Sequence, residues 1–397
     1  MKYRRFGRTE LSIPVLSCGG MRYQQAWKDL DPADIENANQ ENLEQTIHRA
    51  LELGINHIET ARGYGSSEMQ LGWILPKLPR EKMIIQTKVG PDEDPKKFLE
   101  TFEKSMDYLK LDYVDLLSFH GVNTQELTDQ VVLRGGCMEV VRKLQKDGRV
   151  RFVGYSTHGS EAQITAANAT GEFDYVNLHY YFVNELNWPS IEEAKKQDMG
   201  VFIISPSEKG GKLFEPPPKM EELCEPLTPM GFNDLWCLNK PEVHTLSIGA
   251  ARPSDFDAHV DALEFYDDIP ATIAPIEQRL RDEMEREFGE EWCQGWNENL
   301  PEHYDLTGDV NVREILRLYT YAKSLDLVEW GKMRYNLLGN AGHWFPGENV
   351  KVLDEEGWET LQGQLKSSPF AARIPDYMRA AHEMLKGEEK KRQSESD

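Results

Sequence analysis

Short apolar runs alternating with longer amphipathic stretches restrict the fold of this chain more than any other feature of its sequence. Eight runs follow one another between Pro14 and about Leu263: "VLSCGG", "INHIET", "MIIQTKV", "VDLLSFHG", "RFVGYSTHG", "YVNLHYY", "GVFIISP" and "HTLSIGA". Helical patterns such as "NLEQTIHRALEL" and "VVRKLQKDG" separate most neighbours. This alternation is typical of parallel strands connected by helices.

Eight strand-helix units match the roughly 250 residues of a (β/α)8 barrel, whereas an open doubly wound sheet usually has fewer strands. We therefore predict an α/β fold, a (β/α)8 TIM barrel over residues 1–266. From Asp267 onward helical patterns such as "IEQRLRDEMEREFG" dominate, so residues 267–397 are predicted to form a mainly helical C-terminal unit. Its charged end, "GEEKKRQSESD", is predicted to be a frayed tail.

Charge and cysteine usage limit the partners of the chain. Lys and Arg number 45 against 68 Asp and Glu, and the resulting charge of -23 disfavours nonspecific binding to nucleic acid or anionic membranes. The five cysteines are scattered and form no C-x-x-C pair, so no disulfide framework or local metal motif is predicted. No stretch approaches the ~18 apolar residues of a membrane span, and the N-terminus lacks an apolar signal region. We expect a cytoplasmic protein with small-molecule partners and no metal site; an oligomeric state is not predicted.

Ionisable residues lie at the ends of three consecutive apolar runs. Glu59 ends the second run and Tyr64 follows in its loop, Lys88 is near the end of the third, and His120 is near the end of the fourth. Active sites of such barrels form where the strands end. We therefore expect these four side chains to converge.

This set of residues suits proton transfer to a carbonyl group. A phenol, with an ordinary pKa near 10, becomes a usable donor near neutrality when a cation such as Lys88 favours its ionised form. His120 would add a hydrogen bond, and Glu59 would hold the lysine. A nicotinamide could supply the accompanying hydride. Each residue alone commonly has a structural role, so the prediction depends on their combination.

With these residues the chain resembles the aldo-keto reductase superfamily, from "RRFGRTELSIPVLSCGGM" through "INHIETARGYGSSEMQLG" to "LSIGAARPSDFDAHV". The resemblance implies Tyr64 as proton donor, Lys88 as the group that lowers its pKa and His120 as the residue that orients substrate. Glu59 stands where the family has aspartate. It keeps the charge but adds a methylene, which alters the geometry of the lysine contact.

The resemblance also implies a nicotinamide nucleotide site. For the nicotinamide it implies Ser156, Thr157 and Asn177, and for the phosphates and ribose Ser205, Lys209, Gly210, Lys212, Gly249 and Arg252. Pro253 would begin a helix whose N–H groups face a phosphate, and Arg252 would bind the 2′-phosphate. Ile204, Asp255 and His259 depart from the residues usual in relatives. We predict NADP(H), with NAD(H) as the alternative.

The sequence indicates only the general class of the substrate. Four aromatic residues are predicted around the mouth of the barrel and would suit an apolar or aromatic aldehyde or ketone, with rim or core packing as the equal alternative: Tyr23, Trp27, Tyr180 and Tyr181. The long polar loop over residues 21–40 is predicted to gate the substrate site.

The C-terminal region resembles the ferredoxin-like unit found in one branch of the superfamily. "LLGNAGHWFPGENVKV" and "SSPFAARIPDYMRAAHEML" match its framework, but the residues at its cysteine positions are Gly339, Ala341, His343 and Trp344. Iron-sulfur clusters require thiolates. We therefore predict no iron-sulfur cluster and instead an aromatic-rich helical cap containing Trp292, Trp296, Trp330, Trp344 and Trp358.

Two functions follow from these observations. The first is an NADPH-dependent reductase of an aldehyde or ketone with Tyr64 as proton donor. The alternative is a nucleotide-binding regulatory or interaction protein in which Glu59, Ile204 and the altered last helix reflect lost turnover. Both would bind the cofactor, but only the first would oxidise NADPH in the presence of a carbonyl compound.

Overall fold

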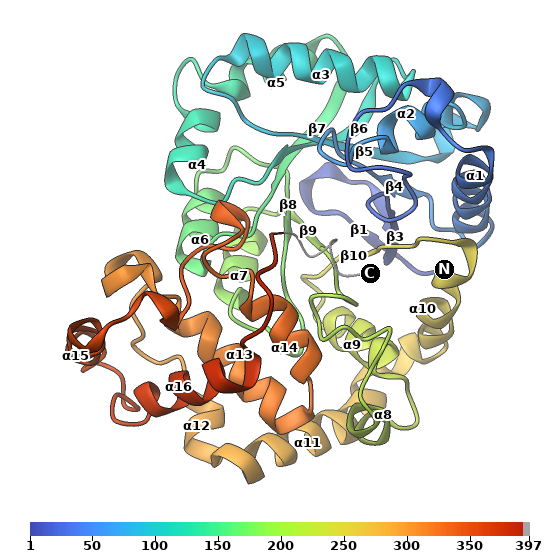
Figure 1. Cartoon of the computed structure of the whole chain (residues 1–397). Helices are drawn as coiled ribbons and strands as arrows, with labels where there is room; N and C mark the ends of the chain where they lie inside the picture. The colour runs from blue at the N-terminus through green and yellow to red at the C-terminus, as the bar shows by residue number, and fades with distance from the viewer. Residues whose placement is uncertain (392–397) are drawn as a thin grey trace. The chain divides into compact units, whose positions relative to one another are not determined.

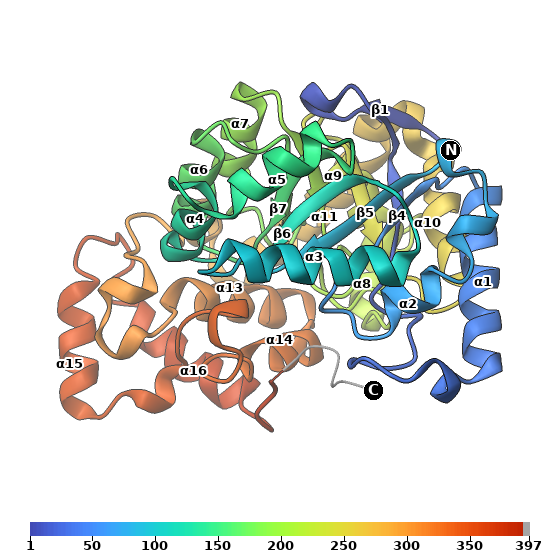
Figure 2. The ribbon, with the colours of Figure 1, turned by 90° about the horizontal axis from the view of Figure 1, so that it is seen from above.

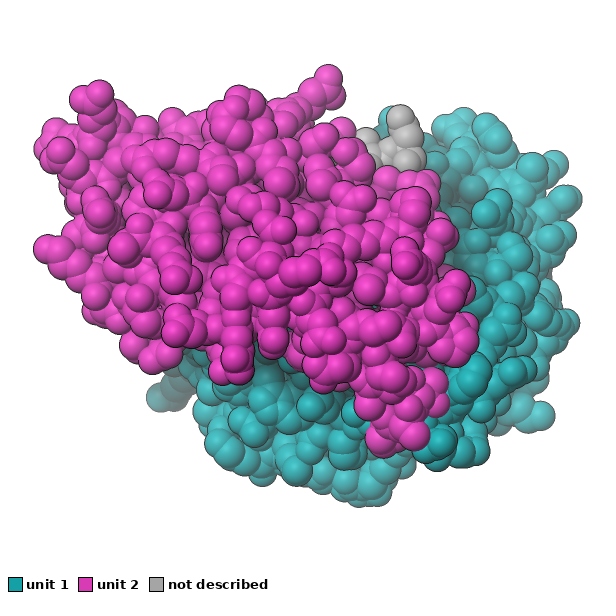
Figure 3. Space-filling model, turned by 90° about the horizontal axis from the view of Figure 1, so that it is seen from below, with its two compact units in different colours: residues 1–207, 233–269 teal, residues 208–232, 270–397 magenta. Residues whose placement is uncertain are grey.

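The structure, a computed structural model, describes residues 1–391 and divides into two compact units. The barrel unit comprises Met1–Ser207 and Asn233–Ile269, and the helical unit comprises Glu208–Phe232 and the chain from Pro270 onward (Figure 3). The predicted boundary between residues 266 and 267 lies close to the second division. The segment Glu208–Phe232, predicted as part of the barrel, groups instead with the helical unit. Residues 392–397 of the predicted frayed tail lie outside the described residues.

The barrel unit contains a closed barrel of eight parallel strands in the order β10-β3-β4-β5-β6-β7-β8-β9. Each strand lies within one of the eight apolar runs or starts one residue before it, so the predicted fold is confirmed. The strands are β3 (Leu16–Gly19), β4 (His57–Glu59), β5 (Ile84–Val89), β6 (Val114–His120), β7 (Val150–Ser156), β8 (Tyr175–Leu178), β9 (Gly200–Ile203) and β10 (Thr245–Ile248).

Helices surround these strands (Figures 1 and 2). They are α1 (Asn37–Glu52), α2 (Ser67–Leu71), α3 (Pro95–Leu109), α4 (Gln125–Val132), α5 (Cys137–Lys146), α6 (Glu161–Ala169), α7 (Trp188–Lys196) and α10 (Asp257–Ala262). Local sequence explains their limits, as in α3, where the Asp94 side chain accepts from the Lys96 N–H and Pro95 takes the first position. Phe98, Phe102 and Leu109 are its buried face.

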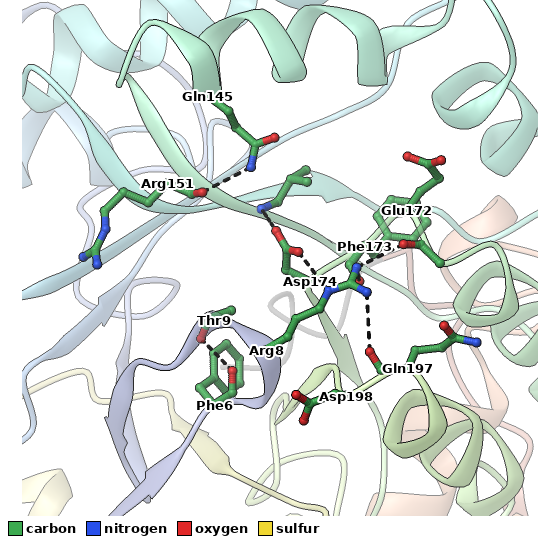
Figure 4. A network of polar contacts seen from close by, with 12 residues as sticks. Phe6, Arg8, Thr9, Gln145, Arg151, Glu172, Phe173, Asp174, Gln197 and Asp198 are labelled. Atoms are coloured by element: carbon green, nitrogen blue, oxygen red, sulfur yellow. Dashed lines mark hydrogen bonds and ion pairs between the residues drawn. The ribbon is translucent and has the colours of Figure 1, made fainter.

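A two-stranded antiparallel hairpin, β1 (Tyr3–Arg5) and β2 (Ser12–Pro14), precedes the barrel and was not predicted. Its Phe6 joins a buried cluster with Tyr175 and Phe202. Arg8 reaches Asp174 at 3.0 Å and donates to the carbonyl oxygen of Phe173 at 2.5 Å (Figure 4). The hairpin is thus held to the barrel by both apolar and charged contacts.

The helical unit contains α8 (Pro218–Cys224), α12 (Glu290–Gly295), α13 (Val312–Leu325), α14 (Val328–Tyr335), α15 (Glu355–Gln364) and α16 (Ile374–Leu385), and nearly all of α11 (Ile269–Phe288). Helix α9 (Pro229–Leu238) has residues in both units. Aromatic side chains form much of the core of the helical unit. The ring centroids of Trp292 and Tyr377, for example, are 4.7 Å apart. Across residues 1–391, no helix combines the length and apolar character needed to span a membrane.

Candidate active site

Three of the four predicted catalytic residues are in direct contact at the carboxyl end of the barrel strands. Glu59 is the last residue of β4, Lys88 lies in β5, and Tyr64 lies in the loop after β4. The Lys88 ammonium forms an ion pair with Glu59 and donates to the Tyr64 hydroxyl at 3.1 Å. The Tyr64 hydroxyl lies 3.5 Å from Glu59 Oε1. The structure therefore supplies the lysine-phenol contact that the sequence predicted.

The fourth residue, His120, is the last of β6 and lies beside the phenol. The Tyr64 and His120 rings meet edge to face, with centroids 5.6 Å apart and planes at 86°. A Cβ atom at Gly63 would lie 3.4 Å from the imidazole Cε1, so residue 63 lies directly beside the histidine ring.

Burial controls the electrostatics of the pair. Glu59 and Lys88 are 2% and 1% exposed, and Lys88 also donates to the Thr60 carbonyl oxygen at 3.1 Å. Burial disfavours the charged ammonium and lowers the pKa of Lys88 well below its ordinary value. Burial also raises the pKa of the Tyr64 phenol, which is opposite to the direction predicted from the sequence. Desolvation is larger here than the attraction of an ammonium that Glu59 already engages.

The loop between β3 and α1 contacts the turn that carries Tyr64. Gly65 has φ of 55°, and a Cβ atom there would lie 2.0 Å from the Ala26 carbonyl oxygen, so both its conformation and this close approach require glycine. Ser66 N–H donates to the same carbonyl at 3.0 Å. The Trp27 ring, 37% exposed, meets the Tyr64 ring edge to face with centroids 6.3 Å apart.

A chain of ion pairs connects this loop to the barrel and was missed by sequence reasoning. Arg62 pairs with buried Glu68 at 2.5 Å and with Asp29 of the loop, and Asp29 also pairs with Lys104 of α3 at 2.6 Å. Glu68 is fully buried and accepts from the Thr87 hydroxyl at 2.5 Å. A buried carboxylate needs such partners. The only sequence signal for this network was Glu68, an acidic residue that follows the small residues of "GSSE".

The residues predicted to bind the nicotinamide lie at the ends of β7 and β8. The Ser156 hydroxyl accepts from the Gly121 N–H at 3.1 Å, and the Thr157 hydroxyl accepts from the Gly159 N–H at 3.0 Å. Asn177 is fully buried, and within residues 1–391 neither its side-chain nitrogen nor its oxygen has a hydrogen-bond partner. Such orphaned buried atoms are costly and indicate a site for a ligand with both a donor and an acceptor. A carboxamide is such a ligand.

The predicted phosphate and ribose residues of the barrel unit are differently placed. Ser205 follows β9 with φ of 52°, and Gly249 follows β10 close to the Arg22 side chain. Arg252 is exposed, and its Nε lies 3.0 Å from Asp255 Oδ1. The helix predicted after Pro253 is a 3-10 turn, Pro253–Phe256, followed by the short α10. It therefore lacks the long run of aligned peptides that would attract a phosphate strongly.

The predicted pyrophosphate loop, which contains Lys209, Gly210 and Lys212, belongs to the helical unit. The Lys209 carbonyl accepts from the Trp330 indole at 3.0 Å. Burial, with a further contribution from Arg334, lowers the pKa of Lys209 to about 7. Gly210 is buried, and Lys212 pairs with Glu215 at 2.6 Å. Binding of pyrophosphate by Lys209, Gly210 and Lys212 remains a prediction from the sequence.

The exposure of the aromatic side chains selects the packing alternative for three of the four mouth residues and corrects the expectation for one tryptophan. Tyr23, Tyr180 and Tyr181 are 1–2% exposed, so of the four residues predicted at the mouth only Trp27 has substantial exposure. In the helical unit Trp292, Trp330 and Trp296 are 0%, 1% and 8% exposed, as expected for a packed core. Trp344 is 39% exposed and is not a core residue. Among the described residues, no group of three or more His, Cys, Asp and Glu side chains could hold a metal ion.

Comparison with known proteins identifies the family of the chain. The model of the Aldo/keto reductase family matches residues 15–216, which is half of the chain. The chain belongs to this family. It is similar to L-galactose dehydrogenase of Arabidopsis thaliana, with 35% identity over 28% of this chain and 36% of that protein. It is also similar to L-glyceraldehyde 3-phosphate reductase of Escherichia coli, with 22% identity over 71% of this chain and 93% of that protein.

Solved structures show the same fold. An aldo-keto reductase from Klebsiella pneumoniae in complex with NADPH aligns with a TM-score of 0.54 and 18% identity, over 66% of this chain and 89% of that one. At this identity the likeness concerns the fold alone. The chain thus spans about a third of the length of the plant relative and most of the length of the bacterial proteins named here. Other relatives are an NADH-specific methylglyoxal reductase of Escherichia coli and a glyoxal reductase of Bacillus subtilis, of which the chain covers 56% and 55%.

Proposed function

We propose that this chain reduces a small aldehyde or ketone with NADPH and that Tyr64 donates the proton. The observation that carries the proposal is the contact between the Lys88 ammonium and the Tyr64 hydroxyl at 3.1 Å, with Glu59 paired to the same ammonium. A phenol that gives up its proton beside an ammonium becomes a stabilised phenolate.

Each residue of the candidate site has a separate role in the proposed carbonyl reduction. A bound nicotinamide supplies a hydride to the carbonyl carbon. Tyr64 transfers its proton to the carbonyl oxygen, so that the C=O bond becomes an alcohol, and Lys88 stabilises the phenolate left behind. Glu59 keeps the ammonium in place, and His120 orients the carbonyl through its position beside the phenol. Asn177 and Ser156 would hold the carboxamide, because the orphaned amide of Asn177 offers both a donor and an acceptor.

The raised pKa of Tyr64 keeps the phenol protonated through the physiological range, as a proton donor requires. The same raised pKa favours the second candidate function. If the phenolate is too costly to form in this buried site, the chain would bind the nucleotide without turning over a carbonyl compound. The two functions share the cofactor and differ only in the chemical step.

One experiment separates them. Purified protein is mixed with NADPH and a panel of small dicarbonyls, aliphatic aldehydes and aromatic aldehydes, and absorbance at the nicotinamide band is followed. We expect substrate-dependent oxidation of NADPH, and Tyr64→Phe should lose about 10²-fold or more of kcat while keeping its affinity for NADPH, as expected when a general acid is removed. Tyr113→Phe is the control, because the ring of Tyr113 packs on Arg80 and not on the site.

The outcomes are distinct. Near-normal turnover in Tyr64→Phe would remove Tyr64 as the donor. Tight binding of NADPH with no oxidation by the wild-type chain across the panel would favour the nucleotide-binding protein.

A further inference from the structure

Six polar side chains form a continuous hydrogen-bonded belt across the interior of the barrel, below the candidate active site. The Thr245 and Ser17 hydroxyls are 2.6 Å apart, and Ser17 lies 2.6 Å from His57 Nδ1. His57 Nε2 lies 3.0 Å from Gln86 Oε1. The belt continues from Gln86 to the Ser118 hydroxyl and from there to the Tyr175 hydroxyl, each over 2.9 Å. All six side chains are fully buried.

From Thr245 to Ser118 the hydrogen bonds of the belt run in a defined direction. Because the Gln86 oxygen can only accept, His57 Nε2 must carry a proton and donate to it. A neutral His57 then accepts at Nδ1 from Ser17, whose oxygen accepts from Thr245. Burial and the nearby Lys88 lower the pKa of His57 to about 3, so the imidazole stays neutral. Every polar side-chain atom of the belt has a partner, which makes the network rigid.

Three of the belt residues, His57, Gln86 and Ser118, are immediate neighbours of the catalytic residues in the barrel. His57 and Gln86 stand two residues before Glu59 and Lys88 on the same strands, so their side chains lie on the same face of the sheet. Across the strands, the register pairs Glu59 with Gln86 and Lys88 with Ser118. His57, Gln86 and Ser118 therefore each adjoin a catalytic residue along the strand, across it, or both.

Placing the belt inside the barrel requires a glycine on β7 and carries a cost in stability. On β7, a Cβ atom at Gly154 would lie 2.6 Å from the Tyr175 ring, so glycine there lets that ring occupy its place in the interior. Buried polar groups are stabilising only when all are paired, and an apolar layer of the same shape often contributes as much stability or more. The belt is therefore better explained by positioning than by stability.

We propose that this belt is a positioning element of the catalytic site, with His57, Gln86 and Ser118 as positioning residues that act through Glu59 and Lys88. It fixes the strand register and the direction of the two catalytic side chains, so that the ammonium remains directed at the Tyr64 hydroxyl. This proposal rests on the proposed role of Tyr64. None of the belt side chains needs to touch substrate or cofactor.

The test compares two substitutions that remove a single buried hydroxyl. Tyr175→Phe removes the end of the belt and keeps the ring. Tyr155→Phe is the matched control, because Tyr155 is equally buried but its hydroxyl is 2.7 Å from Asn168 Oδ1 of α6, outside the belt. Gln86→Leu interrupts the belt at its centre, and Tyr175→Phe keeps the test valid if that variant does not fold.

Two readouts separate positioning from stability. In protein labelled with 13Cζ-tyrosine, the Tyr64 resonance, assigned with Tyr64→Phe, reports the hydrogen bond at its hydroxyl without cofactor or turnover. We expect Tyr175→Phe and Gln86→Leu to move this resonance and to lower kcat by about 3-fold to 10-fold, each tenfold being about 1.4 kcal/mol of barrier, with KM nearly unchanged. Tyr155→Phe should lower the melting temperature but leave the resonance and kcat as in the wild type.

An unmoved Tyr64 resonance in both Tyr175→Phe and Gln86→Leu would overturn the proposal, as would an equal change in Tyr155→Phe. If the wild-type chain shows no turnover, the proposed function fails, while the resonance still decides whether the belt positions Tyr64.

Discussion

The interiors of the two units differ in the kinds of side chain that fill them. The barrel places a polar belt and a buried ion pair at its centre, where Lys88 and Glu59 meet. The helical unit places aromatic rings there, with Trp292 fully buried between Phe288, Phe370 and Tyr377. Hydrogen bonds and ion pairs depend on direction, whereas apolar burial depends mainly on area and fit. Substitutions in the barrel interior should therefore change activity first, and those in the helical unit should change stability first.

The largest effect is expected in the helical unit. Trp292→Ala removes a fully buried ring together with its indole donor to the Thr320 hydroxyl at 3.0 Å. It should lower the free energy of unfolding by about 3–5 kcal/mol, as is usual for such a cavity. Trp344→Ala is the matched control, because that ring is 39% exposed, and its effect should stay within about 0.5–1 kcal/mol.

Urea unfolding of the full chain, followed by circular dichroism, measures both variants. Equal losses for Trp292→Ala and Trp344→Ala would contradict the description of the aromatic core. The result would also show that the exposed fraction of a tryptophan is a poor guide to its contribution in this unit.

A smaller effect is expected from the buried carboxylate of the barrel. Glu59→Gln leaves the Lys88 ammonium without its counter-charge, and should lower kcat by about 10-fold, equivalent to about 1.4 kcal/mol. Burial already lowers the pKa of Lys88, and loss of Glu59 lowers it further. The ammonium is then lost at a lower pH, so the deficit of the variant should grow as pH rises. Glu59→Asp should keep part of the activity.

The helical unit offers a control for this prediction. Glu314 is a carboxylate paired with Arg317 at 2.5 Å, and Glu314→Gln should reduce stability without changing the pH dependence of kcat. A fully active Glu59→Gln protein with a wild-type pH profile would show that the Lys-Glu pair is unnecessary for turnover.

The barrel and the grouping of the residues at the ends of its strands could be predicted because they depend on local pattern and one general rule. Apolar runs mark strands, and parallel strands end at the same face, so Glu59, Lys88 and His120 had to gather there. Partners that lie far apart in sequence could not be predicted. The pairing of Arg62 with Asp29, or of Ser17 with His57, depends on strand register and loop paths that no periodicity records.

Prediction from sequence met the same limit in the helical unit. Composition indicated an aromatic core but not which ring faces it, so Trp344 was grouped with Trp292 although 39% of it is exposed. Likewise, the segment Glu208–Phe232 follows a barrel strand in sequence but groups with the helical unit in space. Side-chain direction and long-range docking are set by packing across the whole unit, which a residue pattern does not contain.

The smallest effect is expected at the surface of the barrel unit, where Arg252 is predicted to bind the 2′-phosphate of NADPH. Its side chain is 72% exposed and paired with Asp255, whose other oxygen accepts from the Ala251 N–H at 2.8 Å. Asp255→Asn keeps an acceptor for that N–H but removes the competing charge. It should therefore tighten NADPH binding by about 2-fold to 5-fold, the size of an exposed ion pair, with little change for NADH. Arg252→Ala should weaken NADPH more than NADH, and both changes should shrink in high salt. Equal shifts for the two nucleotides would place the 2′-phosphate elsewhere.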